Sequence, residues 1–187
     1  IGVQGDVPDF MIYKLEVDFN NPNNPQLKDN VIGWEDLPFF QTVLFGNQKR
    51  PYGLDHINSS RYNVFLERPA VVEALNQDAR RFGLESYGFS EDLRYNWRFG
   101  GFMGRDIQNL GTVTATPEDL DYQAEFAGRL ARTLFYECDG RNYAHVAMAG
   151  TAASTYGYAD AEFTTARFRS RPEARTSCRL IDTGVIA

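Results

Sequence analysis

The sequence has few of the residues that carry metal or redox chemistry. It contains two histidines, His56 and His145, and two cysteines, Cys138 and Cys178, among its 187 residues. Neither histidine lies in an HExxH motif or at ligand spacing from a cysteine, and the cysteines form no CxxC pair. We therefore expect no metal site and no bound cofactor.

Motifs of nucleophilic catalysis and of nucleotide binding are also missing. Ser59–Ser60 lies close to His56, but no GxSxG elbow surrounds it. The glycines within 100–104 do not form GxGxxG after a strand. Carboxylates are numerous, and no pair stands out as an acid and base. The sequence predicts a protein that is not an enzyme, and its net charge of −6 argues against general nucleic-acid binding.

Long apolar runs are absent as well. No stretch approaches the roughly 18 apolar residues of a membrane-spanning helix. This excludes helical spans but leaves strands, which cross a membrane with only alternating apolar residues. The chain begins at Ile1 without a methionine or a signal peptide. We expect either a processed protein or an internal piece of a longer one.

What the sequence does have is alternation of apolar and polar residues. In Pro8–Phe19, every second residue from Met11 onward is apolar, and the residues between them include Lys14, Glu16 and Asp18. Period two over this length predicts a strand with two different faces. In a soluble sandwich the apolar face would form the core, whereas in a membrane barrel it would contact lipid.

The same pattern recurs along the chain. Further strands are predicted at Val31–Trp34, Phe39–Gln48, Arg81–Phe89, Leu93–Phe102, Asp121–Ala131 and Tyr143–Ser154. One helical pattern occurs, at Pro69–Ala79. Connections alternate between short (36–38, 90–92) and long (20–30, 50–80, 103–120), as in barrels with short turns on one side and long loops on the other. A further connection is predicted at Thr133–Asn142. We expect an all-β antiparallel fold of about seven to eight strands, as one domain over 1–187.

Two cationic stretches interrupt this framework. Gly46–Pro69 is irregular and contains Lys49, Arg50, Arg61 and Arg68; long charged loops within a β framework are usually functional. Surface ion pairs are the simplest alternative for its arginines.

The second cationic stretch is Arg167–Arg175, where Arg167, Arg169 and Arg171 fall two residues apart. On extended backbone the three would point to one side, roughly 6–7 Å apart. A row of guanidiniums suits phosphate. The alternative is a solvated basic loop.

Several motifs resemble the phosphate-selective porin O and P family of bacterial outer membranes. They are GNQKxPxGLDxxxSSRxxxFLER (Gly46–Pro69), RYNWRFGGF (Arg94–Phe102), DYQAEFAGRL (Asp121–Leu130), YAHVAMAG (Tyr143–Gly150) and the arginine-rich Arg167–Thr183. The resemblance covers most of the chain from about Tyr13 onward. It implies an antiparallel transmembrane β-barrel in the outer-membrane lipid, usually a homotrimer, of which this chain holds only part, since an aqueous pore needs about 16–18 strands.

The resemblance also implies roles for individual residues. Gly46–Pro69 would include a loop that folds inward and narrows the pore, with Arg61 and Arg68 near the constriction. Lys49 and His56 are second choices there, His56 standing where the family often has a basic residue. A ladder toward the extracellular mouth would comprise Arg167, Arg169, Arg171 and Arg175.

We therefore expect a porin for passive diffusion of small anions, phosphate or polyphosphate, with no reaction catalysed. By the alternation of connections, Cys138 and Cys178 would lie at opposite ends of the barrel, so we expect no disulfide between them. The rival hypothesis is a secreted β-sandwich that binds glycans through Tyr and Trp. A third is a barrel without transport.

Overall fold

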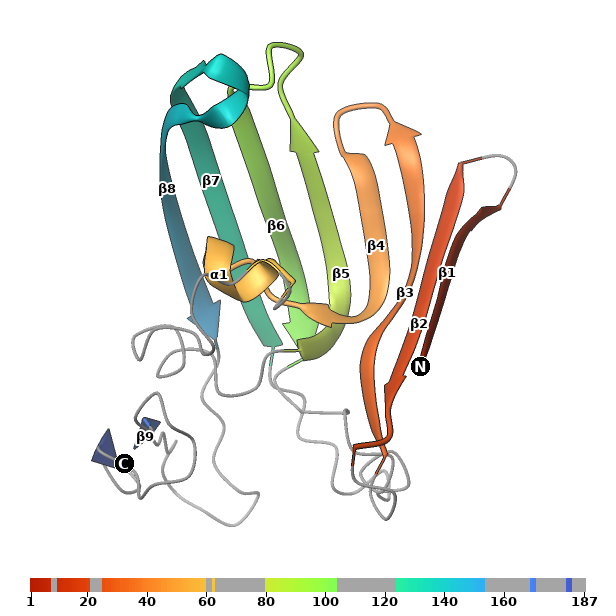
Figure 1. Cartoon of the computed structure of the whole chain (residues 1–187). Coiled ribbons are helices and arrows are strands. Elements are labelled where there is room, and N and C mark those ends of the chain that lie inside the picture. Colours follow the sequence, from red (N-terminus) through yellow and green to blue (C-terminus); the bar gives the residue numbers. More distant parts are fainter. Residues whose placement is uncertain are drawn as a thin grey trace.

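Eight antiparallel strands form one curved sheet. The computed structural model describes residues 1–7, 10–20, 25–59, 62, 80–103, 124–153, 169–170 and 181–182. The strands are β1 (Gly2–Val7), β2 (Met11–Asp18), β3 (Gln26–Leu37), β4 (Gln41–Lys49), β5 (Arg80–Phe89), β6 (Tyr95–Met103), β7 (Ala124–Glu137) and β8 (Asn142–Ala153). They lie in the sheet in chain order (Figure 1), and the edge strands β1 and β8 do not pair with each other. The all-β antiparallel prediction is confirmed as an open sheet.

Four smaller elements accompany the sheet in the described residues. A one-turn helix, α1 (Leu54–Ile57), follows β4, and a 3₁₀ turn, η3 (Cys138–Gly140), joins β7 to β8. The two-residue strands β9 (Arg169–Ser170) and β10 (Ile181–Asp182) pair antiparallel with each other. No helix in the described ranges has the length and apolarity needed to cross a membrane.

The connections differ between the two ends of the sheet. At one end, residues 38–40, 90–94 and 138–141 close tight turns between neighbouring strands (Figure 1). At the other end, longer stretches of the chain, residues 19–25, 50–79 and 104–123, separate consecutive strands. This is the alternation of short and long connections that the sequence predicted.

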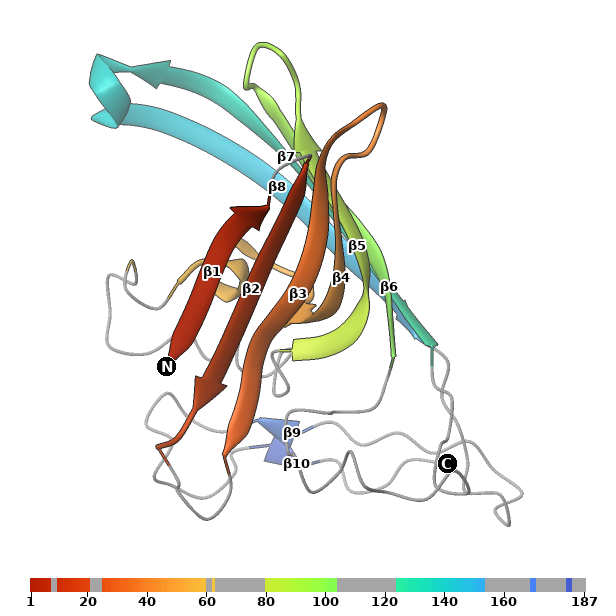
Figure 2. The same cartoon turned by 90° about the vertical axis from the view of Figure 1, so that its right-hand side faces the viewer.

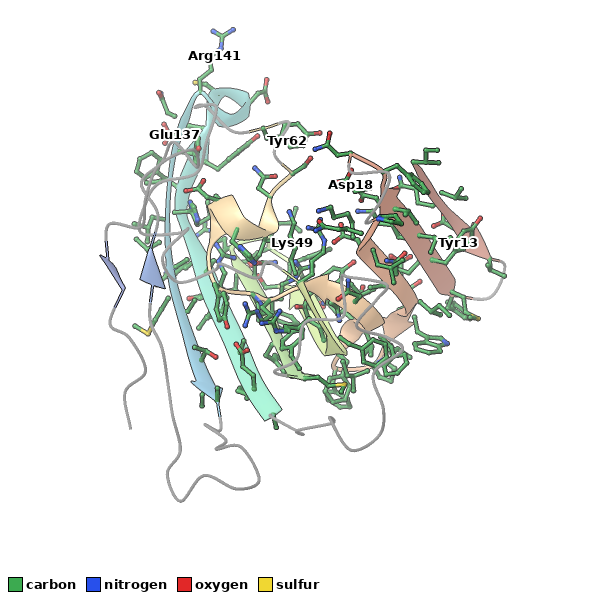
Figure 3. All side chains as sticks on the ribbon, turned by 90° about the horizontal axis from the view of Figure 1, so that it is seen from below. Tyr13, Asp18, Lys49, Tyr62, Glu137 and Arg141 are labelled. Carbon is green, nitrogen blue, oxygen red and sulfur yellow. The ribbon has the colours of Figure 1, made fainter. Side chains whose placement is uncertain are left out.

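The sheet is apolar on its convex face and polar on its concave face. Leu15, Phe126 and Leu130 are more than half exposed on the convex side. In the described part of the chain only three hydrophobic side chains are buried, against ten polar or charged ones, including Glu85 and Arg129. Figures 2 and 3 show the curvature, with Lys49 inside it and Tyr13 outside. This distribution inverts that of a soluble domain, where apolar side chains are inside.

A β-sandwich would require a second layer over the apolar face. Tyr13 and Leu15 are 39% and 53% exposed, and no second sheet covers them in the described residues. The alternating strand Pro8–Phe19 thus has the two faces predicted, and it is the charged face that lies in the concavity.

The largest differences from the predicted strands concern β1, β3 and β7. β1 was not predicted, because its alternation is interrupted by Gly2 and Gly5 and its order comes from pairing along β2. β3 begins at Gln26 rather than Val31, since its first half is polar. β7 continues to Glu137, through residues predicted as a connection. The sequence pattern missed this extension because the register shift between Thr133 and Phe135 breaks the period of two.

Two local predictions remain to be placed. The sequence indicated no helix at Leu54–Ile57, where α1 forms within a stretch interpreted as a polar turn. The helix predicted at Pro69–Ala79 lies outside the described residues.

Candidate functional site

The concave face carries a connected set of charges over β2, β3 and β5. Asp29 accepts a hydrogen bond from the Lys14 ammonium at 2.5 Å and another from Arg80 Nε at 2.5 Å. Lys14 also pairs with Glu16 at 3.2 Å. Because these partners come from three strands, the charges cross-link the wall on its polar side.

The segment after β4 turns into the concavity instead of continuing along the sheet. We call residues 50–59 together with Tyr62 the inward segment, and its helix α1 lies on the concave side (Figures 1 and 2). The ammonium of Lys49 donates to the carbonyl oxygens of Ile57 at 3.2 Å and Asn58 at 2.8 Å. These bonds close the segment back onto the end of β4.

One carboxylate on β7 fastens the inward segment to the opposite part of the wall. Glu125 Oε2 accepts from Arg50 Nη1 at 2.6 Å, and the Arg50 and Glu125 side chains are both less than 10% exposed. Glu125 Oε1 accepts from the hydroxyl of Thr151 at 2.9 Å and also from that of Tyr52. Three donors from two sides of the concavity thus converge on one carboxylate.

The surroundings of Tyr52 disfavour loss of its phenol proton. Burial, followed by the hydrogen bond to Glu125, raises the pKa of Tyr52 to about 12. The Arg50 guanidinium lies 4.7 Å over the Tyr52 ring, and the His56 ring lies 5.9 Å from it on the other part of the segment. His56 itself is 2% exposed. The Tyr52 ring therefore lies close to both a guanidinium and an imidazole, and its phenol is protonated at neutral pH.

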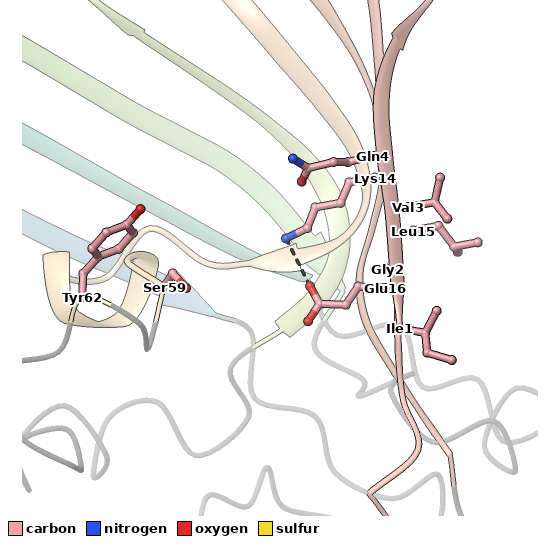
Figure 4. A pocket seen from close by; sticks show the side chains of 9 residues that line it. All are labelled: Ile1, Gly2, Val3, Gln4, Lys14, Leu15, Glu16, Ser59 and Tyr62. Carbon is pink, nitrogen blue, oxygen red and sulfur yellow. Dashed lines mark ion pairs between the residues drawn. The ribbon is translucent and has the colours of Figure 1, made fainter.

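A cavity separates the inward segment from the N-terminal strands. It has a volume of about 720 Å³. Figure 4 shows Gln4, Lys14 and Glu16 pointing from β1 and β2 toward Ser59 and Tyr62. The apolar side chains of the same strands point away from it. A cavity with polar side chains on both sides thus lies between the inward segment and the sheet.

A second polar cluster lies on the concave face of β5, β6 and β7. Arg98 Nε forms an ion pair with Glu85 Oε1 at 2.9 Å, and the Arg98 guanidinium lies 4.6 Å over the Tyr87 ring. Arg129, opposite Arg98 in the register, donates to Asn96 Oδ1 at 3.1 Å. This part of the wall thus holds two neighbouring arginines, one of which is paired with a carboxylate.

The structure describes only some of the residues that the sequence singled out. Lys49 ends β4 next to the inward segment and His56 lies within it, and their part in anion binding stays a prediction. For Arg169 it describes the backbone, which is extended in β9. The remaining predicted residues, Arg61, Arg68, Arg167, Arg171 and Arg175, lie outside the described residues.

Sequence reasoning did not single out several residues of this site, among them Glu125, Arg98 and Arg129. Each of these three alternates with apolar residues in its strand. What was missing was the register that brings Arg98 opposite Arg129 and the turn of the chain that brings Arg50 to Glu125. The available signal was the RYNWR pattern, in which charged residues alternate with aromatic ones.

Comparison with known proteins decides the family. The model of the family described as phosphate-selective porin O and P matches residues 1–187, the whole chain. The chain belongs to this porin family. A porin is a channel of the bacterial outer membrane and not an enzyme, and the two-faced sheet described above agrees with that.

The porin chain also resembles an uncharacterized protein of Caulobacter vibrioides. The two are 27% identical over 199 residues, which covers 100% of this chain and 36% of the relative. The chain thus spans about a third of the length of the curated relative it matches. No solved structure matched the chain. Of the cysteines, Cys138 is an exposed free thiol in the 138–141 turn, and Cys178 lies outside the described residues.

Proposed function

We propose that the protein containing this chain is a channel for passive diffusion of small anions, phosphate or polyphosphate, across the outer membrane. The eight strands are one arc of a closed β-barrel, and the inward segment narrows its lumen. The protein works as a homotrimer, as expected from the family. Conduction needs several weak sites in series, so that an ion is admitted and also released.

The observation that carries this proposal is the reversed distribution of polarity across one sheet. Exposed apolar side chains on the convex face suit lipid, and buried charges on the concave face suit a water-filled lumen. The cavity of about 720 Å³ beside the inward segment supports a passage rather than a filled core.

The preference for anions is supported by the wall beneath α1. On β5, β6 and β7 the charged side chains of the concave face include Arg81, Arg98 and Arg129 against Glu85 and Glu125. Glu125 is already paired with Arg50 of the inward segment. The local field along a pore sets its selectivity, so a net charge of −6 for the chain is compatible with this proposal.

Discrimination between ions is assigned to Arg61 and Arg68, and capture of anions to the row Arg167, Arg169, Arg171 and Arg175. The test is single-channel recording of the full-length protein in a planar bilayer under a KCl gradient. We expect an anion-selective reversal potential that shifts toward zero in Arg61→Ala plus Arg68→Ala.

The matched control is Arg141→Ala, which removes an exposed arginine from the 138–141 turn; it should leave the reversal potential unchanged. A cation-selective wild-type channel would overturn the proposal as a whole. An unchanged reversal potential in the double variant would overturn the assignment of Arg61 and Arg68.

A further inference from the structure

Two arginines face each other across neighbouring strands of the concave wall. Arg98 on β6 and Arg129 on β7 are register partners, so their Cα atoms are about 4.5–5.5 Å apart. Like charges directly opposite on a sheet destabilise it. Such a pair therefore needs negative charge close by.

The structure supplies only part of that negative charge. Glu85 is 1% exposed, and its Oε1 forms an ion pair with Arg98 Nε at 2.9 Å. Its other oxygen, Oε2, has no hydrogen-bond partner. The ion pair involves Nε, and the two terminal nitrogens of Arg98 make no hydrogen bond within the described residues. They are therefore still available as donors to an anion.

Arg129 is the less compensated member of the pair. Arg129 is 8% exposed, and its Nη1 donates to the uncharged amide oxygen of Asn96 at 3.1 Å. Within the described part of the chain no carboxylate pairs with it. Asn96 orients the guanidinium without neutralising it, so Glu85, paired with Arg98 alone, leaves the cluster with a net positive charge.

We propose that this cluster binds a small tetrahedral oxyanion, phosphate or sulfate, between the guanidiniums of Arg98 and Arg129. It is a wall site distinct from the constriction and from the 167–175 row, and it rests on the proposed channel function. Planar guanidiniums bind such oxyanions through paired N–H donors. Glu85 holds Arg98 in place and keeps the net charge low, which lets the ion leave again.

The test is block of chloride current by added inorganic phosphate, with sulfate as a second probe, in the full-length channel. In Arg129→Gln the phosphate concentration for half-block should rise about tenfold, the usual size of one lost charge-assisted hydrogen bond. In Glu85→Gln it should fall, because a competing negative charge is gone. A merely structural role for the cluster would weaken block in both variants.

The matched control is Arg132→Gln, three residues further along β7. Its guanidinium lies 5.2 Å over the Tyr95 ring on the other face of the sheet, so phosphate block should not change. Unaltered block in Arg129→Gln, in an anion-selective channel, would overturn the site while the proposed function stands. If that variant does not fold, Glu85→Gln decides: unchanged or weaker block overturns the site. A wild-type channel that prefers cations would instead refute the proposed function.

Discussion

The guanidinium of Arg50 and the carboxylate of Glu125 meet at 2.6 Å although 75 positions separate them in the sequence. Arg50 begins the inward segment, and Glu125 lies at the start of β7. Both side chains are buried on the concave face. The pair therefore fixes where the inward segment crosses the concave face, which is the feature that the proposed constriction depends on.

Loss of the Glu125 charge should release the inward segment. Breaking a buried ion pair by removing one partner costs about 3 kcal/mol or more, because the other charge is left buried. In Glu125→Gln we expect hydrogen exchange of the amides in 52–58 to accelerate about a hundredfold, measured by mass spectrometry on the full-length protein. Glu137→Gln, an exposed glutamate at the far end of β7, is the control. Equal protection in the two variants would show that Glu125 does not hold the segment.

The phenol of Tyr52 should lose its proton at a higher pH than an ordinary tyrosine. Its pKa is raised from 10.0 to about 12, so the folded state keeps the proton that the unfolded state releases near pH 10. The associated stabilisation is present below pH 10 and is lost as the pH rises from 10 through 12. The tyrosinate absorbance of the wild type is measured against pH, and that of Tyr52→Phe is subtracted. The difference should show one transition near pH 12. Adding Glu125→Gln to both proteins should lower that midpoint, and a wild-type transition already near pH 10 would contradict the assignment.

The strands were more predictable than the contacts between them. In β6 the alternation of Tyr95, Trp97 and Phe99 with Asn96 and Arg98 is a local property, and it correctly assigns the two faces. Which residue lies across from Arg98 depends on how β6 pairs with β7, two strands that residues 104–123 separate along the chain. A one-residue difference in register would move a side chain to the other face.

The inward segment shows the other limit of sequence reasoning. Its cationic and irregular composition marked it as functional, and the family pattern placed it in the lumen. Its partner Glu125 lies far along the chain, and no spacing rule connects this carboxylate to Arg50 or Tyr52. Hydrogen bonds of this kind are set by tertiary packing, which single-sequence patterns do not encode.

Gly46 should be intolerant of any side chain. Its φ of +139° is a conformation that other residues rarely adopt, and a Cβ there would lie 2.1 Å from the carbonyl oxygen of Asn30. Gly46→Ala should lower the free energy of unfolding by about 1–3 kcal/mol. Gly101→Ala, where a Cβ meets open space, is the control. The temperature at which the folded band disappears, read by comparing heated with unheated samples on gels, should fall for Gly46→Ala and not for Gly101→Ala. Equal temperatures for the two variants would contradict the close approach of β3 and β4.

Lysine substitutions at two neighbouring positions of β8 should have different effects on folding into a membrane. Met148 is 80% exposed and pairs with Leu130 on the apolar face, whereas Ala149 pairs with Arg129 on the polar face. Lysine on the lipid side of a barrel costs about 2–4 kcal/mol near the bilayer midplane, and in the lumen it is solvated. Met148→Lys should therefore reduce the yield of protein folded into vesicles, while Ala149→Lys should fold normally. Equal folding of the two variants would mean that the convex face does not contact lipid, and the barrel proposed from this sheet would have to be abandoned.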